Sequence, residues 1–254
     1  MNRTPVTLPG YVNLDLPDPP ADRPYVLVNM VMSADGKIVI EGTEAGLGSP
    51  SDQALMRALR TNVDAVLNGA STLRKSGSSP ELDDEALEAL RIARGLGRTP
   101  LGVVLTRSGD LPLDTPFFTS DAFEALVFAT DATAEGALGR LRDTPRPVEV
   151  VPEADAPAAM LRSLREQHGV RWLLCEGGAR LNGCLFDAGL VDECFITVAP
   201  RVVGGDVTLT PVRGPRLASF AETWPLRLVS AVPNPDTDEV YLRYRVASER
   251  GVEP

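Results

Sequence analysis

Histidine and cysteine are scarce in this 254-residue chain, and their scarcity excludes several kinds of chemistry. The single histidine, His168, lies in a polar stretch and is predicted to be a surface residue at a helix end, so neither a Ser-His-Asp triad nor a histidine-rich metal site is expected. The three cysteines, Cys175, Cys184 and Cys194, form no CxxC pair. We expect them to be buried, reduced thiols of a cytosolic protein.

Positive charge is also in short supply, which excludes several partners. The formal net charge is −10, and only two of the 25 basic residues are lysines. Nucleic acids and acidic membranes bind to cationic faces, so neither is expected as a partner. No segment approaches the 18 to 20 apolar residues of a membrane span, and the N-terminus lacks the apolar run of a signal peptide. These absences predict a cytoplasmic protein, but they leave phosphorylated small molecules open as ligands.

What the sequence does contain is an alternation of β-branched runs with segments of helical spacing, typical of a mostly parallel sheet covered on both faces. Strands are predicted at Tyr25–Met32, Val63–Leu67, Leu101–Leu105, Ala125–Ala129, Val148–Val151, Trp172–Cys175 and Glu193–Val198. Helices are predicted at Ser51–Arg60, Asp84–Gly95, Ala132–Leu141, Asp155–Gln167 and Ala179–Gly189. Ser49 and Asp155 are the expected caps of two of these helices, and Pro50 suits a first helical turn.

The two ends of the chain differ from this pattern. Six prolines within the first 24 residues predict an extended arm over residues 1–22. Leu226–Val232 and Glu239–Val246 flank a Pro- and Asp-rich turn and are expected to form an antiparallel hairpin. With no repeat or linker in between, we predict one α/β domain over residues 23–247 and a short tail over 248–254.

The stretch from Trp172 to Gly183 is the first candidate ligand site. A buried strand runs into Gly177 and Gly178 and directly into a helix. Free backbone N–H groups at a helix start, together with the helix dipole, favour a phosphate, and glycines let it approach closely. A plain tight turn between strand and helix explains the same residues, and the sequence alone does not decide between the two.

Two further turns follow predicted strands. Gly69, Ser71 and Thr72 come after the second strand, where the hydroxyl groups suit either a helix cap or a cofactor contact. Arg107 comes after the third strand, where a guanidinium can bind a 2′-phosphate in a bidentate manner or simply be solvated. The carboxyl ends of parallel strands are where α/β sheets bind ligands. No GxGxxG sequence follows the first strand, so an ordinary Rossmann domain is not expected.

Four blocks, in order, resemble the pyrimidine reductases of riboflavin biosynthesis. They are Arg23–Val26 leading to Met32–Lys37, then Val63–Thr72, Glu176–Gly183, and Gly189–Gly205. The resemblance extends over residues 23 to 246. It implies a dihydrofolate-reductase-like three-layer α/β fold, NADPH as hydride donor and a homodimer. The implied reaction reduces the ribosyl group of a phosphoribosylaminopyrimidine to ribityl and requires no metal.

The same resemblance implies roles for individual residues. Thr72 and the Gly178–Cys184 turn, with Gly178, Ala179, Arg180 and Leu181, are the NADPH contacts that the resemblance implies. Gly69, Arg107 and Gly177 are expected to join them because they follow the predicted strands. Asn29, Arg60 and Glu176 are the expected substrate contacts. Asn29, Asp35 and Glu176 are the catalytic candidates, with Asp35 on the substrate or nicotinamide side.

The chain departs from the family pattern beside this site. Ser76 occupies the place of a common aspartate, the block Glu44–Gly48 replaces a Ser-Arg-Trp-Ile sequence, and a helical insertion spans Asp83–Gly97. These departures leave two alternatives open. One is a related NADPH reductase acting on a pterin, dihydrofolate or another imine, and the other is a dinucleotide-binding protein without catalysis.

Overall fold

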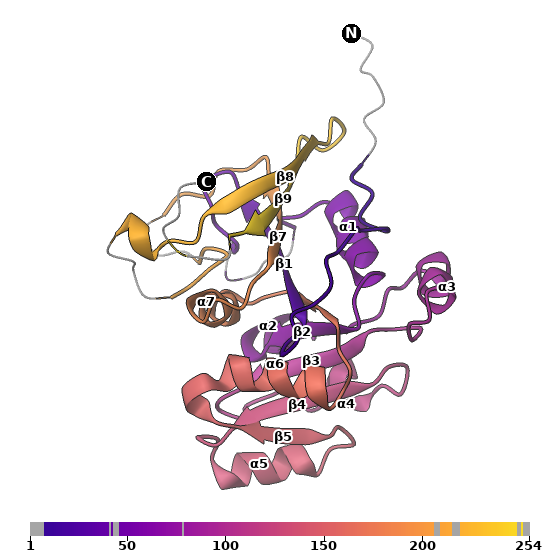
Figure 1. Ribbon diagram of the computed structural model, residues 1–254, viewed down its shortest axis with the longest axis vertical. Helices are drawn as coiled ribbons and strands as arrows, with labels where there is room; N and C mark the ends of the chain where they lie inside the picture. Colours follow the sequence, from indigo (N-terminus) through magenta and orange to yellow (C-terminus); the bar gives the residue numbers. More distant parts are fainter. Residues whose placement is uncertain are drawn as a thin grey trace.

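A computed structural model describes residues 8–40, 42, 46–77, 79–205, 209–214, 219–247 and 250. Within these residues the chain forms a mixed sheet in the strand order β5-β4-β3-β2-β6-β1-β7-β9-β8 (Figure 1). The strands are β1 (Tyr25–Ser33), β2 (Ala65–Gly69), β3 (Leu101–Thr106), β4 (Ala125–Thr130), β5 (Val148–Val151), β6 (Trp172–Cys175), β7 (Glu193–Ala199), β8 (Leu226–Pro233) and β9 (Val240–Val246). Neighbouring strands from β5 to β7 run parallel, whereas β9 is antiparallel to both β7 and β8.

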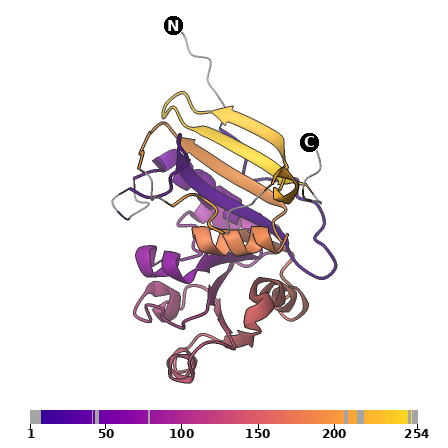
Figure 2. The same cartoon turned by 90° about the vertical axis from the view of Figure 1, so that its left-hand side faces the viewer.

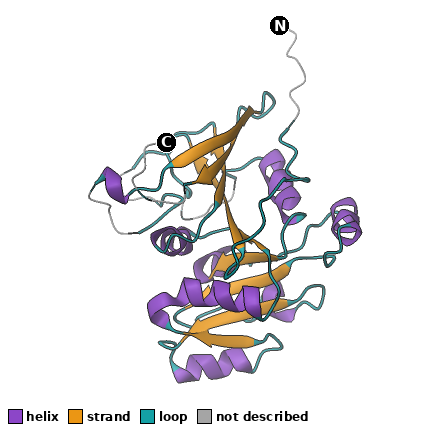
Figure 3. Cartoon of the chain, in the orientation of Figure 1, coloured by secondary structure: helices purple, strands orange, loops and turns teal. Residues whose placement is uncertain are grey.

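Helices lie on both faces of this sheet, which gives three layers (Figure 3). They are α1 (Pro50–Arg60), α2 (Ala70–Ser76), α3 (Glu85–Ala93), α4 (Pro116–Thr119), α5 (Glu135–Arg142), α6 (Ala156–Glu166) and α7 (Ala179–Asp187), with 3-10 turns at Glu153–Asp155 and Phe220–Glu222. Apolar residues of α6 and α7 pack on one face of the sheet. Those of α1, α2, α4 and α5 pack on the opposite face, in two separate clusters.

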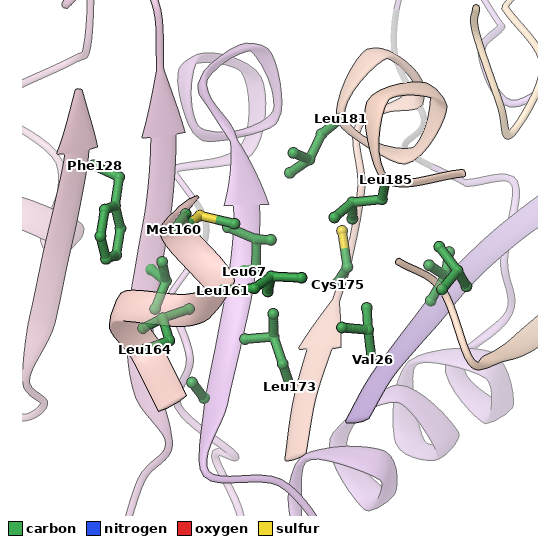
Figure 4. Packing of buried hydrophobic residues seen from close by; sticks show 14 of the residues in the cluster. Val26, Leu67, Phe128, Met160, Leu161, Leu164, Leu173, Cys175, Leu181 and Leu185 are labelled. Atoms are coloured by element: carbon green, nitrogen blue, oxygen red, sulfur yellow. The ribbon is translucent and has the colours of Figure 1, made fainter. Parts of the chain in front are cut away.

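The largest cluster of buried side chains lies between α6, α7 and the central strands (Figure 4). Met160, Leu161 and Leu164 of α6 face the strand residues Leu67 and Leu173. Their spacing places them on one stripe of the helix, and all five side chains are fully buried. Burial of such side chains stabilises the fold by about 1.5–3 kcal/mol each. This packing holds the carboxyl ends of β2 and β6 in a fixed position.

The predicted α/β alternation is confirmed, including the C-terminal hairpin. Figure 2 shows β8, β9, β7 and β1 side by side at one end of the sheet. The second strand begins and ends two residues later than predicted, because Val63 and Asp64 form the bend that leads into it. Helices α2 and α4 were not predicted, since seven and four residues are too few to show a helical period.

Two local expectations need correction. Cys184 is exposed, whereas Cys175 and Cys194 are buried as expected. On α7, Leu181, Asn182 and Leu185 are buried, whereas Cys184 lies on the side of the helix turned away from the sheet. Asp155 occupies the N-cap position of α6, but its side chain makes no capping hydrogen bond; Ser49, by contrast, does cap α1 and accepts from two backbone N–H groups.

The part of the N-terminal arm that the structure describes packs against the domain. Tyr11 is buried with its ring 5.0 Å from that of Phe195, in edge-to-face geometry. The side chain of Asn62 bonds the backbone of Tyr11 and Leu14. Residues 1–7 and all of the predicted tail except Arg250 lie outside the described residues. Of the described helices, none has the length and apolar character needed to cross a membrane.

A buried carboxylate joins the parallel part of the sheet to the hairpin. Glu193 on β7 has no exposed surface, and its oxygens accept from Tyr25 of β1 and from Arg243 and Arg245 of β9. Burial together with this negative charge raises the pKa of the Tyr25 hydroxyl. The three partners therefore satisfy a charge that would be costly to bury alone.

Replacing Glu193 with glutamine should lower the free energy of unfolding by about 3 kcal/mol, because it leaves two guanidinium groups without their counter-ion. Urea denaturation measures this change. The matched control is Glu135→Gln, which removes an exposed carboxylate 3.6 Å from Arg142 and should change stability by less than about 0.5 kcal/mol. Equal effects of the two substitutions would contradict this account of the buried network.

Candidate active site

The turns that follow β2 and β6 meet at the carboxyl edge of the sheet. The backbone N–H of Gly69 donates to the carbonyl of Gly177 at 2.7 Å, and the N–H of Glu176 donates to the carbonyl of Leu67 at 3.0 Å. Because β2 and β6 are parallel neighbours, their carboxyl ends emerge side by side. Two segments about a hundred residues apart in sequence thereby form one surface.

Glycine is required at three positions of this surface because the two turns approach so closely. A Cβ on Gly69 would lie 3.2 Å from the backbone nitrogen of Gly178. One on Gly178 would lie 3.0 Å from the Thr72 hydroxyl oxygen. Gly177 has φ +91° and faces the sulfur of Met30, so a side chain there is disfavoured by both backbone and space. The Gly177–Gly178 peptide bond is cis.

Three adjoining cavities surround this pair of turns. One of about 540 Å³ is bordered by Gly69, Arg107, Gly178, Arg180 and Leu181. A second, of about 250 Å³, shares Gly178 and Arg180 with the first and adds Ala179 and Thr72. The third, of about 440 Å³, begins on the other side of Thr72 and extends toward α1. We call the first two the dinucleotide cavities and the third the α1 cavity.

The dinucleotide cavities suit a ligand with several phosphates. Five basic side chains border them, belonging to Arg74, Lys75, Arg107, Arg180 and Arg213, against a single carboxylate from Glu153. The N-terminus of α7 starts at Gly178, and no side chain caps its first turn. Uncapped N–H groups and convergent cations are the donor set that phosphates bind. The residues present therefore fit a nicotinamide dinucleotide, and a pyrophosphate at Gly178–Leu181 remains a prediction.

Arg107 borders the larger of the two dinucleotide cavities. Its side chain is 76% exposed and its Nε lies 2.7 Å from a carboxylate oxygen of Glu153. An exposed pair of this kind is weak and readily exchanged for a ligand phosphate. That Arg107 binds the 2′-phosphate of NADPH remains a prediction.

A buried ion pair forms one wall of the α1 cavity. Arg60, at the end of α1, donates from Nε and Nη2 to the two carboxylate oxygens of Glu176, both at 2.7 Å. Its Nη1 donates to the backbone carbonyl of Glu81. Burial opposes the charge of Arg60, but the attraction of Glu176 outweighs it and raises the pKa of the guanidinium. The sequence-predicted substrate residues Arg60 and Glu176 are thus each other's partners.

Asn29 and Asn68 place amide groups on the same cavity. Asn29 comes from β1 and Asn68 from the end of β2. Asn68 is 5% exposed, and its side-chain oxygen accepts no hydrogen bond from the described residues. A buried acceptor without a partner is unusual and is satisfied when a ligand donor arrives. Sequence reasoning missed Asn68, although an asparagine at the end of an otherwise apolar strand was a visible signal.

Asp52 in the first turn of α1 is a second residue of the cavity that sequence reasoning missed. Burial raises the pKa of its carboxyl group to about 6, a rise opposed by the hydroxyl of Thr197 and reinforced by the charge of Glu239. Gly48 lies against this carboxyl group, and a Cβ at residue 48 would overlap it. Asp52 was read only as part of a helix start.

Two predicted site residues do not border any of the three cavities as described. Gly177 lies beneath them and supplies the carbonyl that bonds Gly69. Asp35 accepts from the Ser33 hydroxyl and from the backbone N–H groups of Val203 and Gly204, and these bonds hold the pKa of its carboxyl group well below the usual range. Its contacts fasten the turn after β1 to the glycine turn after β7. A catalytic role for Asp35 remains a prediction.

The segments that depart from the family pattern border the α1 cavity. Ser76, Ser79 and Asp83 come from the altered loop and the start of the insertion. Helix α3 of that insertion does not itself line the cavity; its buried Arg91 instead bonds the backbone carbonyls of Arg60 and Val63. Of the replaced block, Gly46 and Gly48 border the cavity, whereas Glu44 and Ala45 lie outside the described residues.

Comparisons with known proteins agree with this geometry. Curated relatives include the 2,5-diamino-6-ribosylamino-4(3H)-pyrimidinone 5′-phosphate reductase of Methanothermobacter thermautotrophicus, 28% identical over 208 residues that cover 81% of this chain and 91% of the relative. The protein of the same description from Aquifex aeolicus is 24% identical over 214 residues, covering 82% and 91%.

Solved structures share the fold. A pyrimidine reductase-like protein from Corynebacterium diphtheriae superposes with a TM-score of 0.74 at 22% identity, covering 89% of this chain and 93% of that one. The riboflavin biosynthesis reductase Rib7 of Saccharomyces cerevisiae gives 0.62 at 16% identity, covering 89% and 90%. The predicted dihydrofolate-reductase-like α/β fold is confirmed. The family model described as the RibD C-terminal domain matches residues 24–231, so the chain belongs to that family, as its four sequence blocks predicted.

Proposed function

We propose that this protein is an NADPH-dependent reductase that converts the ribosyl group of a phosphoribosylaminopyrimidine to ribityl in riboflavin biosynthesis. The observation that carries the proposal is the arrangement of the cavities. The dinucleotide cavities, which are lined by cationic side chains, adjoin at Thr72 the α1 cavity, which is bordered by Asn29, Asn68 and Glu176. The printed names of the relatives support the same activity. NADPH as the donor, a homodimeric assembly and a cytoplasmic location belong to the proposal.

Different residues of the chain hold the cofactor and contact the substrate. NADPH, when bound, supplies the hydride. Gly178 to Leu181 and the surrounding arginines hold its phosphates, while the close contact of Gly69 with Gly178 keeps the two turns at one separation. Asn29 and Asn68 offer amide groups for the sugar-derived part of the substrate. Arg60 and Glu176 form a rigid wall whose paired charges are already in place before the substrate binds.

A second candidate has a specific observation in its favour. Ser76 and Asp83 border the α1 cavity where the altered loop departs from the family pattern. A changed cavity wall changes which substrate fits, since specificity resides in contacts of the pocket. The alternative is a reductase of the same fold acting on a pterin, dihydrofolate or another imine.

Activity is tested by following NADPH absorbance with the ribosylaminopyrimidine phosphate and identifying the product by mass spectrometry. We expect stoichiometric oxidation of NADPH and a product two hydrogen atoms heavier than the substrate. Turnover of dihydrofolate or a pterin instead would favour the second candidate. NADPH binding without turnover of any of these compounds would indicate that the protein binds a dinucleotide but does not catalyse a reduction.

Gly178→Val should weaken NADPH binding by about tenfold or more, because the new side chain meets the hydroxyl groups of Thr72 and Ser71 where the pyrophosphate is proposed to lie. Fluorescence titration measures the Kd. The control is Gly136→Val on α5, where a Cβ meets nothing within 4 Å. Unchanged affinity in a folded Gly178→Val protein would remove the pyrophosphate from this turn.

Arg107→Ala should reduce the preference for NADPH over NADH by about tenfold, since a guanidinium–phosphate pair is lost only with the phosphorylated cofactor. The ratio of the two Kd values is the measurement. Arg140→Ala, which removes an exposed arginine of α5 that does not border these cavities, should leave the ratio unchanged. A ratio that stays constant in both variants would assign 2′-phosphate recognition to another cation.

A further inference from the structure

The larger dinucleotide cavity extends beyond the turn at which the pyrophosphate is proposed to lie. It is bordered by Gly178 at one end and by Thr106, Arg107 and Thr130, where β3 and β4 finish, at the other. The α1 cavity is bordered by residues of β1 and β2, and in the sheet β3 and β4 lie on the opposite side of β2 from β1. With the nicotinamide directed to the α1 cavity, the adenosine half of the dinucleotide would extend over β3 and β4.

The hydroxyl group of Thr130 points to a ligand in this part of the cavity. The residue is 3% exposed, and its Oγ1 has no hydrogen-bond partner among the described residues. Every side chain that borders the cavity belongs to a described segment of the chain. Buried polar groups of folded proteins are nearly always paired. A ligand hydroxyl or phosphate oxygen in the cavity would supply the partner that the protein does not.

An acidic and a basic side chain lie side by side at the same end of the cavity. The Nε of Arg107 lies 2.7 Å from a carboxylate oxygen of Glu153, and both residues border the cavity. The backbone N–H of Glu153 donates to the carboxylate of Asp131 at 2.9 Å, and the backbone carbonyl of Arg107 accepts from the Thr133 hydroxyl at 2.9 Å. These bonds fasten both segments, so the cavity presents the carboxylate and the guanidinium together.

The two side chains prefer different forms of the adenosine ribose. A carboxylate only accepts hydrogen bonds, so Glu153 suits a free 2′-hydroxyl group and repels a 2′-phosphate. A guanidinium only donates, so Arg107 suits the phosphate. Dinucleotide-binding proteins use an acidic residue for the hydroxyl form and an arginine for the phosphorylated form. This chain has both at one place, and the 36% exposure of Glu153 allows water to solvate its carboxylate when Arg107 turns to a phosphate.

We propose that Glu153 and Thr130 bind the adenosine ribose of the dinucleotide, and that Glu153 determines specificity by allowing a free 2′-hydroxyl group as well as a 2′-phosphate. The inference rests on the proposed function, in which a dinucleotide occupies these cavities. Glu153 lowers the affinity for the phosphorylated form because it occupies Arg107 and carries a like charge. It raises the affinity for the hydroxyl form because it accepts a hydrogen bond from it.

The decisive test compares the Kd values of NADPH and NADH for the full-length protein by fluorescence titration. We expect saturable binding of both, with NADPH about tenfold tighter. Glu153→Gln should strengthen NADPH binding, weaken NADH binding and so raise the Kd ratio by a further factor of about ten. A purely structural role of Glu153 would move both Kd values in the same direction. An unchanged ratio, or no NADH binding below about 1 mM, would overturn the inference.

The matched control is Glu135→Gln. Glu135 is an exposed carboxylate 3.6 Å from Arg142 on α5, and it does not border the dinucleotide cavities. Its replacement should leave the Kd ratio unchanged. An equal rise in the ratio with Glu135→Gln would overturn the inference, because the effect would then come from the net charge of the chain.

ADP-ribose and its 2′-phosphate locate the effect, because they retain the pyrophosphate but lack the nicotinamide. Calorimetry should show the same rise in their Kd ratio with Glu153→Gln. A rise confined to the complete dinucleotides would overturn the placement of the adenosine ribose beside Glu153. Binding of neither dinucleotide would overturn the proposed function together with the inference. Dinucleotide binding without reduction of the ribosylaminopyrimidine would overturn the proposed function alone.

Thr130→Val tests the second residue. It removes the hydroxyl group at nearly constant volume and should weaken both dinucleotides by about threefold to tenfold, the value of one hydrogen bond. The Tm of the protein without ligand should not fall, because this hydroxyl has no partner among the described residues. Thr119→Val on α4, whose hydroxyl donates to the backbone carbonyl of Thr115, should leave both Kd values unchanged. Unaltered Kd values in Thr130→Val would overturn the contact of Thr130 with the ribose.

Discussion

The contact between the turns after β2 and β6 is the constraint on which the rest of the site depends. One short hydrogen bond, from the N–H of Gly69 to the carbonyl of Gly177, joins them at the carboxyl edge of the sheet. It brings together the turns that carry Thr72 and Gly178, which are among the residues shared by adjoining cavities. The contact is possible only because neither turn carries a side chain at the point of approach.

Charge is distributed unevenly around that contact. The chain as a whole is acidic, yet the cavities bordered by Arg74, Arg107 and Arg180 are cationic, and the α1 cavity across Thr72 is lined by carboxyl groups. Bulk charge therefore says little about a ligand of this size, because a few convergent side chains determine the local field. The two kinds of cavity therefore differ in the charge that they present to a ligand.

Two buried ionic groups, Glu193 and Arg91, join elements around the site without bordering its cavities. Glu193 connects β1, β7 and β9, and Arg91 connects α3 to the backbone at the end of α1. Without Glu193 and Arg91, charged side chains or backbone carbonyl groups inside the protein would have no partner. This explains why polar residues interrupt otherwise apolar segments.

The sequence by itself determined the alternating α/β pattern, the hairpin and the family, because hydrophobic periodicity and glycine-rich turns are local signals. It also drew attention to the glycine turns after β2 and β6, because a strand that ends in glycines before a helix can be recognised from the sequence alone; their role in cofactor binding remains a prediction. Only the tertiary structure decided which polar groups face each other. The pairing of Arg60 with Glu176, the unpartnered oxygen of Asn68, the exposure of Cys184 and the acidic lining of the α1 cavity all depend on contacts between distant segments. Such contacts follow from strand order and packing, and no local pattern encodes them.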